Sequence, residues 1–276
     1  MAVVLDKLVS PLLRRRELVG TSLVFAGLSS ACEPELVVGK VSVHASSACP
    51  LPDSEGGAPG VEDKVVETGW TTSFENGFCD YEPPFGFCYM NGDASFVIAE
   101  NPVHGGTSSA AFSVNTSSGT AQTRCFLEGA LPRDAMYGAW FYIPALAQNT
   151  GNWNLMYVQG VVPPTPGLWD VSLGNSDDGS LHLYLFSHLG PAVPERDPPL
   201  AVPIASWFHV EFRLLRAPDA TGAVALYQDG VLVQEATGIV TDAFDLHHWY
   251  VGNLASSLTP PDSTIYVDDV TVTAAP

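Results

Sequence analysis

Three acidic residues near the two ends of one predicted domain are suited to binding a cation. Glu75 lies in segment 73–77, and Asp268 and Asp269 lie inside the otherwise apolar segment 265–272. A charge within a strand is unfavourable unless it is paired, solvated or bound to a cation. Because calcium prefers carboxylate oxygens, we expect the first and last strands to lie side by side and these acids to share a structural calcium ion.

Aromatic and amide side chains could form a second site, for a sugar. Aromatic rings stack on the apolar faces of sugars, and amide or carboxylate groups bond to the hydroxyls. Residues 153, 157 and 159 share one strand face by their spacing, residues 182 and 184 share another, and residues 169 and 175 are expected on a nearby loop. The predicted ligand-binding residues are Trp153, Tyr157, Gln159, Trp169, Asn175, His182 and Tyr184.

Strands must position these side chains, because apolar and polar residues alternate repeatedly from residue 70 onward. In segment 181–186 the leucines alternate with His182, Tyr184 and Phe186, and Asp229-Gly230 supplies the positive φ angles of a two-residue hairpin. Trp140 is assigned to the core, and segment 247–250 to a strand at a sheet edge. The clearest predicted strands are 139–143, 153–159, 181–186, 208–215, 224–227, 231–235 and 264–272.

No capped helix pattern follows the N-terminal segment. Many short strands with frequent turns are typical of an all-β fold. We therefore predict a two-sheet antiparallel β-sandwich, a jelly roll, over residues 70–276.

The charge of the chain excludes one class of partner. From residue 65 on, the sequence has five arginines, no lysine and 22 acidic residues, a net charge of −17. Nucleic-acid binding needs clustered lysine and arginine, so it is excluded. The same repulsion disfavours an anionic polysaccharide relative to a neutral one.

Residues 1–32 resemble an export signal. The arginines at 14–16 precede an apolar stretch, 18–28, that is shorter than the ~20 residues a membrane-spanning helix needs. Segment 28–32 resembles a bacterial lipobox and predicts lipidation of Cys32; cleavage by ordinary signal peptidase before Cys32, or twin-arginine export, are the alternatives. Residues 33–69, rich in proline, glycine and serine, predict a mostly irregular linker. The expected location is extracytoplasmic, as an outer-membrane or cell-surface lipoprotein or a secreted protein.

Once Cys32 is set aside, four cysteines remain, an even number that suits an oxidising compartment. Four cysteines allow three pairings. We favour Cys88 with Cys125 and Cys49 with Cys79, and the alternative is Cys79 with Cys88.

Six short motifs follow one another at 74–77, 102–110, 138–144, 207–211, 227–233 and 265–272. Their order resembles the concanavalin A-like lectin/glucanase superfamily, and within it glucuronan-lyase-like polysaccharide lyases and jelly-roll carbohydrate-binding modules, over residues 70–274. The resemblance implies a calcium ion held by Glu75, a carbonyl of residues 105–107, and Asp268 or Asp269. It also implies a disulfide like Cys88–Cys125.

The resemblance raises the question of catalysis. A lyase must neutralise a uronate carboxylate and remove the C5 proton, yet segments 167–173 and 181–186 have no arginine or lysine. No strand presents two carboxylates about 5–5.5 Å apart, as retaining hydrolysis requires. No catalytic residue is therefore assigned; in an enzyme, an atypical site would use His182, Tyr184, Tyr157 and Gln159.

We therefore predict an exported, lipid-anchored surface protein that binds a carbohydrate without catalysis. The glycan is expected to be neutral rather than anionic, and the membrane is reached only through the lipid on Cys32. The alternatives are a polysaccharide lyase or glycoside hydrolase with an atypical site, and a structural envelope lipoprotein.

Overall fold

Strands make up almost all of the regular structure in the computed structural model, which describes residues 69–81, 86–129, 131–160, 167–189, 192–242 and 247–275. The predicted export signal, Cys32, Cys49 and most of the linker lie outside the described residues. The single-turn 3-10 helix η2 (Cys79–Tyr81) is the one helix in these ranges. No helix there has the length and apolar character needed to cross a membrane.

One sheet has eight strands, all antiparallel to their neighbours. They are β1 (Trp70–Thr72), β3 (Asp93–Ala99), β4 (Ser109–Asn115), β6 (Asp134–Tyr142), β11 (Trp207–Leu215), β12 (Gly222–Gln228), β13 (Val231–Ile239) and β16 (Asp262–Ala274). Their order is β13-β12-β11-β6-β16-β4-β3, and β1 pairs with β16.

The second sheet has six strands in the order β10-β9-β8-β14-β5-β2. A separate two-stranded ribbon pairs β15 (Leu258–Thr259) with β7 (Gln148–Asn149). The strands of the six-stranded sheet are β2 (Gly86–Asn91), β5 (Ala121–Gly129), β8 (Trp153–Gly160), β9 (Gly167–Asn175), β10 (Leu181–Ser187) and β14 (His247–Ala255).

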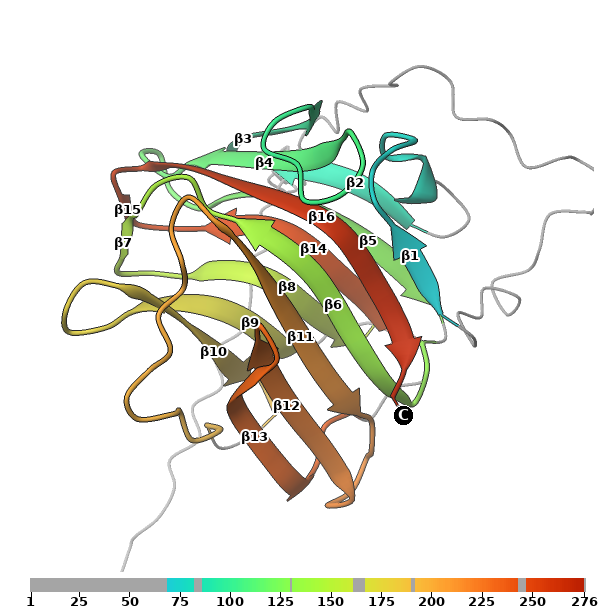
Figure 1. The fold of residues 1–276 in the computed structure, drawn as a ribbon. Coiled ribbons are helices and arrows are strands. Elements are labelled where there is room, and N and C mark those ends of the chain that lie inside the picture. The colour runs from blue at the N-terminus through green and yellow to red at the C-terminus, as the bar shows by residue number, and fades with distance from the viewer. Residues whose placement is uncertain are drawn as a thin grey trace, which may run out of the picture. The chain divides into compact units, whose positions relative to one another are not determined.

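The two sheets lie face to face, with the eight-stranded sheet nearer the viewer in Figure 1. Alternate residues of each strand point into the space between them, so the leucines of β10 are buried while His182, Tyr184 and Phe186 are not. Asp229 and Gly230 both have positive φ and join β12 to β13 in the predicted two-residue hairpin. The prediction of an all-β, two-sheet antiparallel sandwich is confirmed, and the arrangement is consistent with a jelly roll.

The first and last strands are neighbours, as the acidic residues at the two ends suggested. Trp70 of β1 lies opposite Val272 of β16. The loop of residues 102–108 then joins the acids of the two ends. Asp268 Oδ2 accepts hydrogen bonds from the backbone amides of His104 (2.9 Å) and Gly105 (3.1 Å). Glu75 Oε1 accepts from the amides of residues 107 (2.8 Å) and 108 (3.0 Å).

These contacts give the three acids a structural role in joining the two ends of the domain. The hydroxyl and amide of Thr107 hold the pKa of Glu75 below its usual range, and His104 Nδ1 lies 2.6 Å from Asp269 Oδ2. Within the described ranges, no group of three or more histidine, cysteine, aspartate or glutamate side chains is arranged to hold a metal. The calcium ion stays a prediction.

A disulfide joins Cys88 of β2 to Cys125 of β5, which lie directly opposite each other in the sheet. It confirms the favoured pairing and excludes the alternative Cys79–Cys88. The pairing of Cys79 with Cys49 stays a prediction, because Cys49 lies outside the described residues. The disulfide fixes the edge strand β2 against β5, whose outward side chains form part of the site described below.

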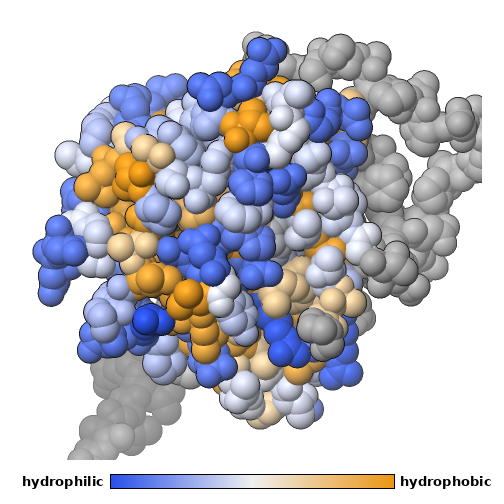
Figure 2. Space-filling model, viewed as in Figure 1, coloured by the Kyte–Doolittle hydropathy of each residue, from blue (hydrophilic) through white to orange (hydrophobic). Residues whose placement is uncertain are grey.

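Trp140 lies on the outward side of β6, which corrects its predicted place in the core. Ala139 and Phe141 take the inward positions, so alternation turns Trp140 to the surface. Its ring stacks between His104, at 3.8 Å between ring centroids, and His209, at 4.9 Å. Figure 2 shows this face of the molecule, where hydrophilic residues separate the hydrophobic patches.

The stack predicts a pH-dependent stability. Burial holds the pKa of His209 below its usual range, although the carboxylates of Glu211, Asp229 and Asp269 act in the opposite direction. The unfolded chain therefore binds this proton at a higher pH, so the free energy of unfolding falls as the pH drops through about 6.5 and stops falling below the folded pKa. We expect the melting temperature to decrease less between about pH 7.5 and about pH 5 in His209→Phe, which keeps a ring on Trp140, than in the wild type. Identical decreases would contradict this prediction.

Candidate functional site

The outer face of the six-stranded sheet carries a continuous group of polar and aromatic side chains. Cross-strand register places outward residues side by side from β2 through β5, β14, β8 and β9 to β10. We call this surface the tyrosine face. Its members are Phe87, Tyr89, Gln122, Arg124, Phe126, Glu128, Tyr157, Gln159, Asp170, His182, Tyr184, Phe186, His248 and Tyr250.

Arg124 is the one guanidinium on the tyrosine face. It is only 6% exposed, and its charge lies 4.6 Å from the ring centre of Tyr250, 5.4 Å from that of Tyr157 and 5.9 Å from that of Tyr89. Nη2 donates to Gln122 Oε1 (2.7 Å) and to the Tyr89 hydroxyl (2.9 Å). Its buried Nε–H has no hydrogen-bond partner among the described residues. The positive charge of the guanidinium, rather than this buried N–H, is what could attract an anionic ligand group.

A glycine makes room for this arginine. Gly252 of β14 lies opposite Arg124 and has a φ of +146°. A Cβ there would lie 2.5 Å from the backbone oxygen of Thr123 and 3.2 Å from Arg124 Cγ. Any other residue would therefore collide with β5 and with the arginine side chain that crosses it.

A hydrogen-bonded row lies beside Arg124. His248 Nε2 is 2.7 Å from Glu128 Oε2 and Nδ1 is 3.0 Å from the Tyr250 hydroxyl. Gln159 Nε2 donates to that hydroxyl at 2.7 Å, so Tyr250 donates its own proton to His248. Burial raises the pKa of Tyr250 well above its usual range. The row holds Tyr250 as a protonated phenol.

Tyr157, Asp170 and His188 form a second group of contacts, on the side of Arg124 away from β5. The rings of Tyr157 and His188 are 5.9 Å apart between centroids, and His188 Nε2 lies 3.1 Å from Asp170 Oδ1. Burial, followed by the charge of Asp170, raises the pKa of Tyr157 to about 12. Burial also raises the pKa of Asp170, against the opposing effect of His188. With Nε2 donating to Asp170, His188 presents Nδ1 as a proton acceptor.

Four of the predicted residues meet on this face: Tyr157, Gln159, His182 and Tyr184. His182 and Tyr184 lie on the edge strand β10, and His182 is held by Ser176 (3.0 Å) and Glu195 (3.5 Å). Four strand spacings of ~4.8 Å separate β10 from β5, about 19 Å. His188 directly follows β10 as well, but its ring lies 5.9 Å from that of Tyr157, the ring that the Arg124 guanidinium overlies.

The other three predicted residues do not reach the tyrosine face. Trp153 and Trp169 are 0% and 1% exposed and belong to the core. A register shift between residues 154 and 156 of β8 reverses the alternation, which puts Trp153 and Tyr157 on opposite faces. Asn175 ends strand β9 rather than lying in a loop, and its Oδ1 accepts a hydrogen bond from the Asn149 amide (2.7 Å).

The sequence prediction also missed Arg124, His188, Glu128, His248 and Tyr250, and it expected Asp170 on a loop rather than on strand β9. The signal was the alternation in segment 121–128, where polar or aromatic residues occupy every even position. Segment 247–250 was predicted at a sheet edge, and that prediction is wrong. It belongs to β14, which lies between β5 and β8. His248 and Tyr250 therefore lie in the middle of the face.

Two acids on the tyrosine face are too far apart for hydrolysis by paired carboxylates. Glu128 on β5 and Asp170 on β9 are three strand spacings apart, about 14 Å. Glycoside hydrolysis uses carboxyl groups about 5–9.5 Å apart. The arginine, phenol and imidazole groups instead suit binding of an anionic sugar and transfer of its protons.

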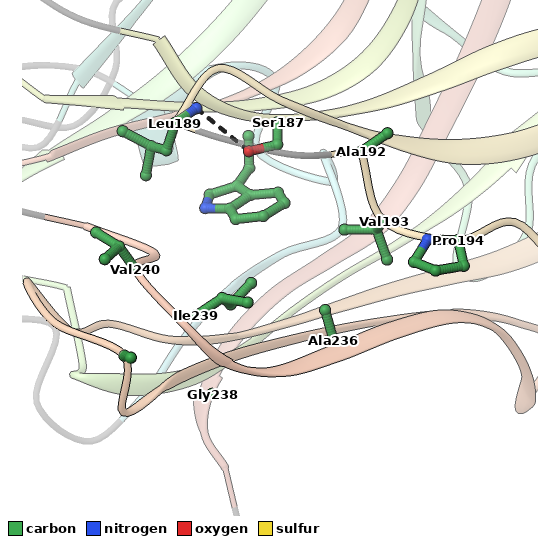
Figure 3. Close-up of a pocket in the computed structure, with 11 residues that line it drawn as sticks. Ser187, Leu189, Ala192, Val193, Pro194, Ala236, Gly238, Ile239 and Val240 are labelled. Carbon is green, nitrogen blue, oxygen red and sulfur yellow. Dashed lines mark hydrogen bonds between the residues drawn. The ribbon is translucent and has the colours of Figure 1, made fainter. Parts of the chain in front are cut away.

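A cavity of about 470 Å3 lies elsewhere, where β10 and β13 end (Figure 3). Its walls are mainly aliphatic, and the residues that line it are Trp169, Ser187, Leu189, Ala192, Val193, Pro194, Ala220, Ala236, Gly238, Ile239 and Val240. Its one polar side chain, Ser187, accepts a hydrogen bond from the Leu189 amide at 3.2 Å. Among the described residues, no charged or titratable group lines it, so it lacks groups to orient a sugar.

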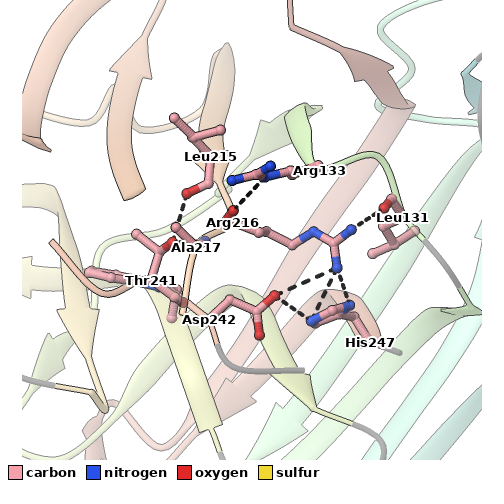
Figure 4. A network of polar contacts seen from close by, with 9 residues as sticks. Leu131, Arg133, Leu215, Arg216, Ala217, Thr241, Asp242 and His247 are labelled. Carbon is pink, nitrogen blue, oxygen red and sulfur yellow. Dashed lines mark hydrogen bonds and ion pairs between the residues drawn. The ribbon is translucent and has the colours of Figure 1, made fainter. Parts of the chain in front are cut away.

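A second polar cluster is closed to solvent. Arg216, Asp242 and His247 form a network under the sandwich end (Figure 4), with His247 Nε2 2.6 Å from Asp242 Oδ2 and Arg216 Nη1 2.7 Å from His247 Nδ1. Their side chains are 13%, 3% and 0% exposed. The cluster pairs buried charges and leaves no surface for a ligand.

Comparison with known proteins supports the fold. No family model matches this sequence, and no curated protein matches it. The endo-β-1,4-glucuronan lyase of the fungus Trichoderma reesei has a similar structure, with a TM-score of 0.52 and 14% identity over 71% of this chain and 93% of that one. The PL-14 alginate lyase of Aplysia kurodai has a TM-score of 0.53 and 10% identity over 75% of this chain and 98% of that one. The cellulose induced protein Cip1 has a TM-score of 0.53 and 12% identity over 75% of this chain and 97% of that one. At these identities the likeness shows a shared jelly-roll fold and no more.

Proposed function

We propose that this protein is a polysaccharide lyase whose tyrosine face binds a uronate-containing polysaccharide. The observation that carries the proposal is the guanidinium of Arg124, the one permanent cation of the tyrosine face, lying 5.4 Å from the ring of Tyr157. The likeness to the glucuronan and alginate lyases supports it. The neutral glycan that the overall charge favoured is replaced here by an anionic one, because the local cation is what a carboxylate would contact.

The chain's own groups can carry each part of a β-elimination. Arg124 would neutralise the uronate carboxylate, which makes the C5 proton more acidic. His188, oriented by Asp170, would take that proton through Nδ1 as the C4–C5 double bond forms. The C4–O4 bond would break, and the leaving oxygen would take the proton of Tyr157. The electrons balance without water, metal or an external oxidant.

An absorbance assay tests this function. We expect the full chain to produce the unsaturated uronate, seen as rising ultraviolet absorbance, from at least one polymer in a panel of homopolyuronates and mixed uronate polymers. A neutral glucan, which has no carboxylate, serves as the control and should give no rise. If no uronate polymer binds and none gives a rise in absorbance, the proposal is refuted.

Binding without catalysis is the second candidate function. It is favoured by the neighbouring rings of the tyrosine face, because aromatic rings stack on the apolar faces of sugars whether or not the sugar is cleaved. The same assay separates the two: polymer binding without a rise in absorbance would assign a carbohydrate-binding protein. The disulfide Cys88–Cys125 suits the oxidising compartment of an exported protein in either case.

A further inference from the structure

One row of directly opposed residues crosses the whole tyrosine face, from one edge strand of the sheet to the other. Cross-strand register pairs each member with the next, from β2 through β5, β14, β8 and β9 to β10 (Figure 1). Five strand spacings of ~4.8 Å make the row about 24 Å long. We call it the cross-strand row, and its members in this order are Phe87, Phe126, Tyr250, Tyr157, Asp170 and Phe186.

Ring contacts are continuous along the cross-strand row. From β2 to β8 its four rings lie 4.3, 5.2 and 5.5 Å apart between successive centroids. From Tyr157 the contacts pass to His188, at 5.9 Å, and from His188 to Phe186, at 4.9 Å. His188 pairs with Asp170, so its imidazole bridges the place where the carboxylate interrupts the rings. The aromatic groups thus form one connected series from edge to edge.

The two ends of the cross-strand row are its most exposed parts. Phe87 is 46% exposed and Phe186 49%, whereas Phe126 and Tyr250 are only 4% and 6% exposed. Of the phenylalanine, tyrosine and tryptophan residues in the described ranges, these two phenylalanines are the most exposed. Contact with a ligand at either end would remove apolar ring surface from water, which is favourable.

Arg124 lies over the middle of the cross-strand row. Its guanidinium is 4.6 Å from the ring centre of Tyr250 and 5.4 Å from that of Tyr157, on the two central strands. Phe87 is two strand spacings from Tyr250, and Phe186 is two from Tyr157, about 10 Å in each case. A sugar held by Arg124 therefore reaches neither phenylalanine, and only further sugars on both sides of it could do so.

We propose that Phe87 and Phe186 are the two end contacts of an extended sugar-binding site along the cross-strand row, so that the tyrosine face prefers a long oligosaccharide to a short one. This inference rests on the proposed function and adds the chain length of its ligand and two residues that recognise it. Each phenylalanine ring would stack on the apolar face of a sugar. Stacking needs no opposite charge, so both ends suit uronates although the domain is acidic.

Oligosaccharides of two lengths test the extended site by titration calorimetry. The probes are trisaccharides and octasaccharides of glucuronan and of alginate, and the protein is the full chain with Tyr157→Phe, which should slow cleavage during the titration. We expect the octasaccharide to bind about 100-fold more tightly than the trisaccharide of the same polymer, about ten-fold for each ring that gains a sugar. Phe87→Ala and Phe186→Ala should each weaken octasaccharide binding about ten-fold and leave trisaccharide binding unchanged.

Val97→Ala is the matched control, because Val97 is 57% exposed on β3, an edge strand of the other sheet. It should change neither affinity, and unchanged melting temperatures would show that all three variants fold.

Three results would overturn the extended site and leave the proposed function standing. They are equal binding of the two lengths, losses in the phenylalanine variants no larger than in Val97→Ala, and a loss at only one of the two rings, since the chain would then not span the row. If neither length binds, or if adding Arg124→Ala leaves the binding of both unchanged, the proposed function fails as well.

Discussion

Arg124→Ala should lose about 100- to 1,000-fold in kcat/KM on a uronate polymer, the usual cost of removing one group that stabilises developing negative charge. The guanidinium is the one permanent cation of the tyrosine face and lies among three tyrosine rings. Arg124→Lys should restore little, because lysine keeps the charge but lacks the planar fork that matches a carboxylate. The measurement is the initial rate of absorbance increase.

Arg213→Ala is the control for this prediction. It removes a guanidinium that pairs with Asp134 on the other sheet, so the net charge changes equally while the tyrosine face does not. An unchanged melting temperature would show that Arg124→Ala still folds. Full activity in the folded Arg124→Ala protein would rule out the proposed role of the arginine.

Tyr157→Phe should lower kcat by about 100- to 10,000-fold, the range for loss of a general acid, while the dissociation constant of the polymer changes little. The ring remains available for packing and only the proton is lost. Because burial raises the pKa of Tyr157 to about 12, the phenol keeps its proton at every pH at which the assay can be run. The pH profile of the activity should therefore show no decrease caused by ionisation of this phenol.

Tyr266→Phe, on the outward side of β16 in the other sheet, is the matched variant. This variant should have the kcat and the polymer dissociation constant of the wild type. If Tyr157→Phe weakens binding and leaves kcat unchanged, the hydroxyl holds the substrate, and another group must protonate the leaving oxygen. Comparing kcat and binding in the same variant separates these two roles.

The sequence predicted part of the candidate site. Tyr157, Gln159, His182 and Tyr184 were predicted because aromatic and amide residues alternate with apolar ones, and all four lie on the tyrosine face. The same reasoning placed Trp153 with Tyr157, and a register shift in β8 put them on opposite faces. A bulge depends on pairing with the neighbouring strand, so the spacing within one strand does not reveal it.

The sequence by itself determined the all-β class, the hairpin at Asp229-Gly230 and the approach of the first and last strands. Those features follow from local alternation, turn residues and the placement of acids. Only the tertiary structure decided which strands became neighbours. Arg124, Tyr157 and Tyr250 meet because β14 pairs with both β5 and β8, although the residues lie far apart in the chain. Such long-range pairing is set by how the two sheets pack as a whole, which no short stretch of sequence specifies.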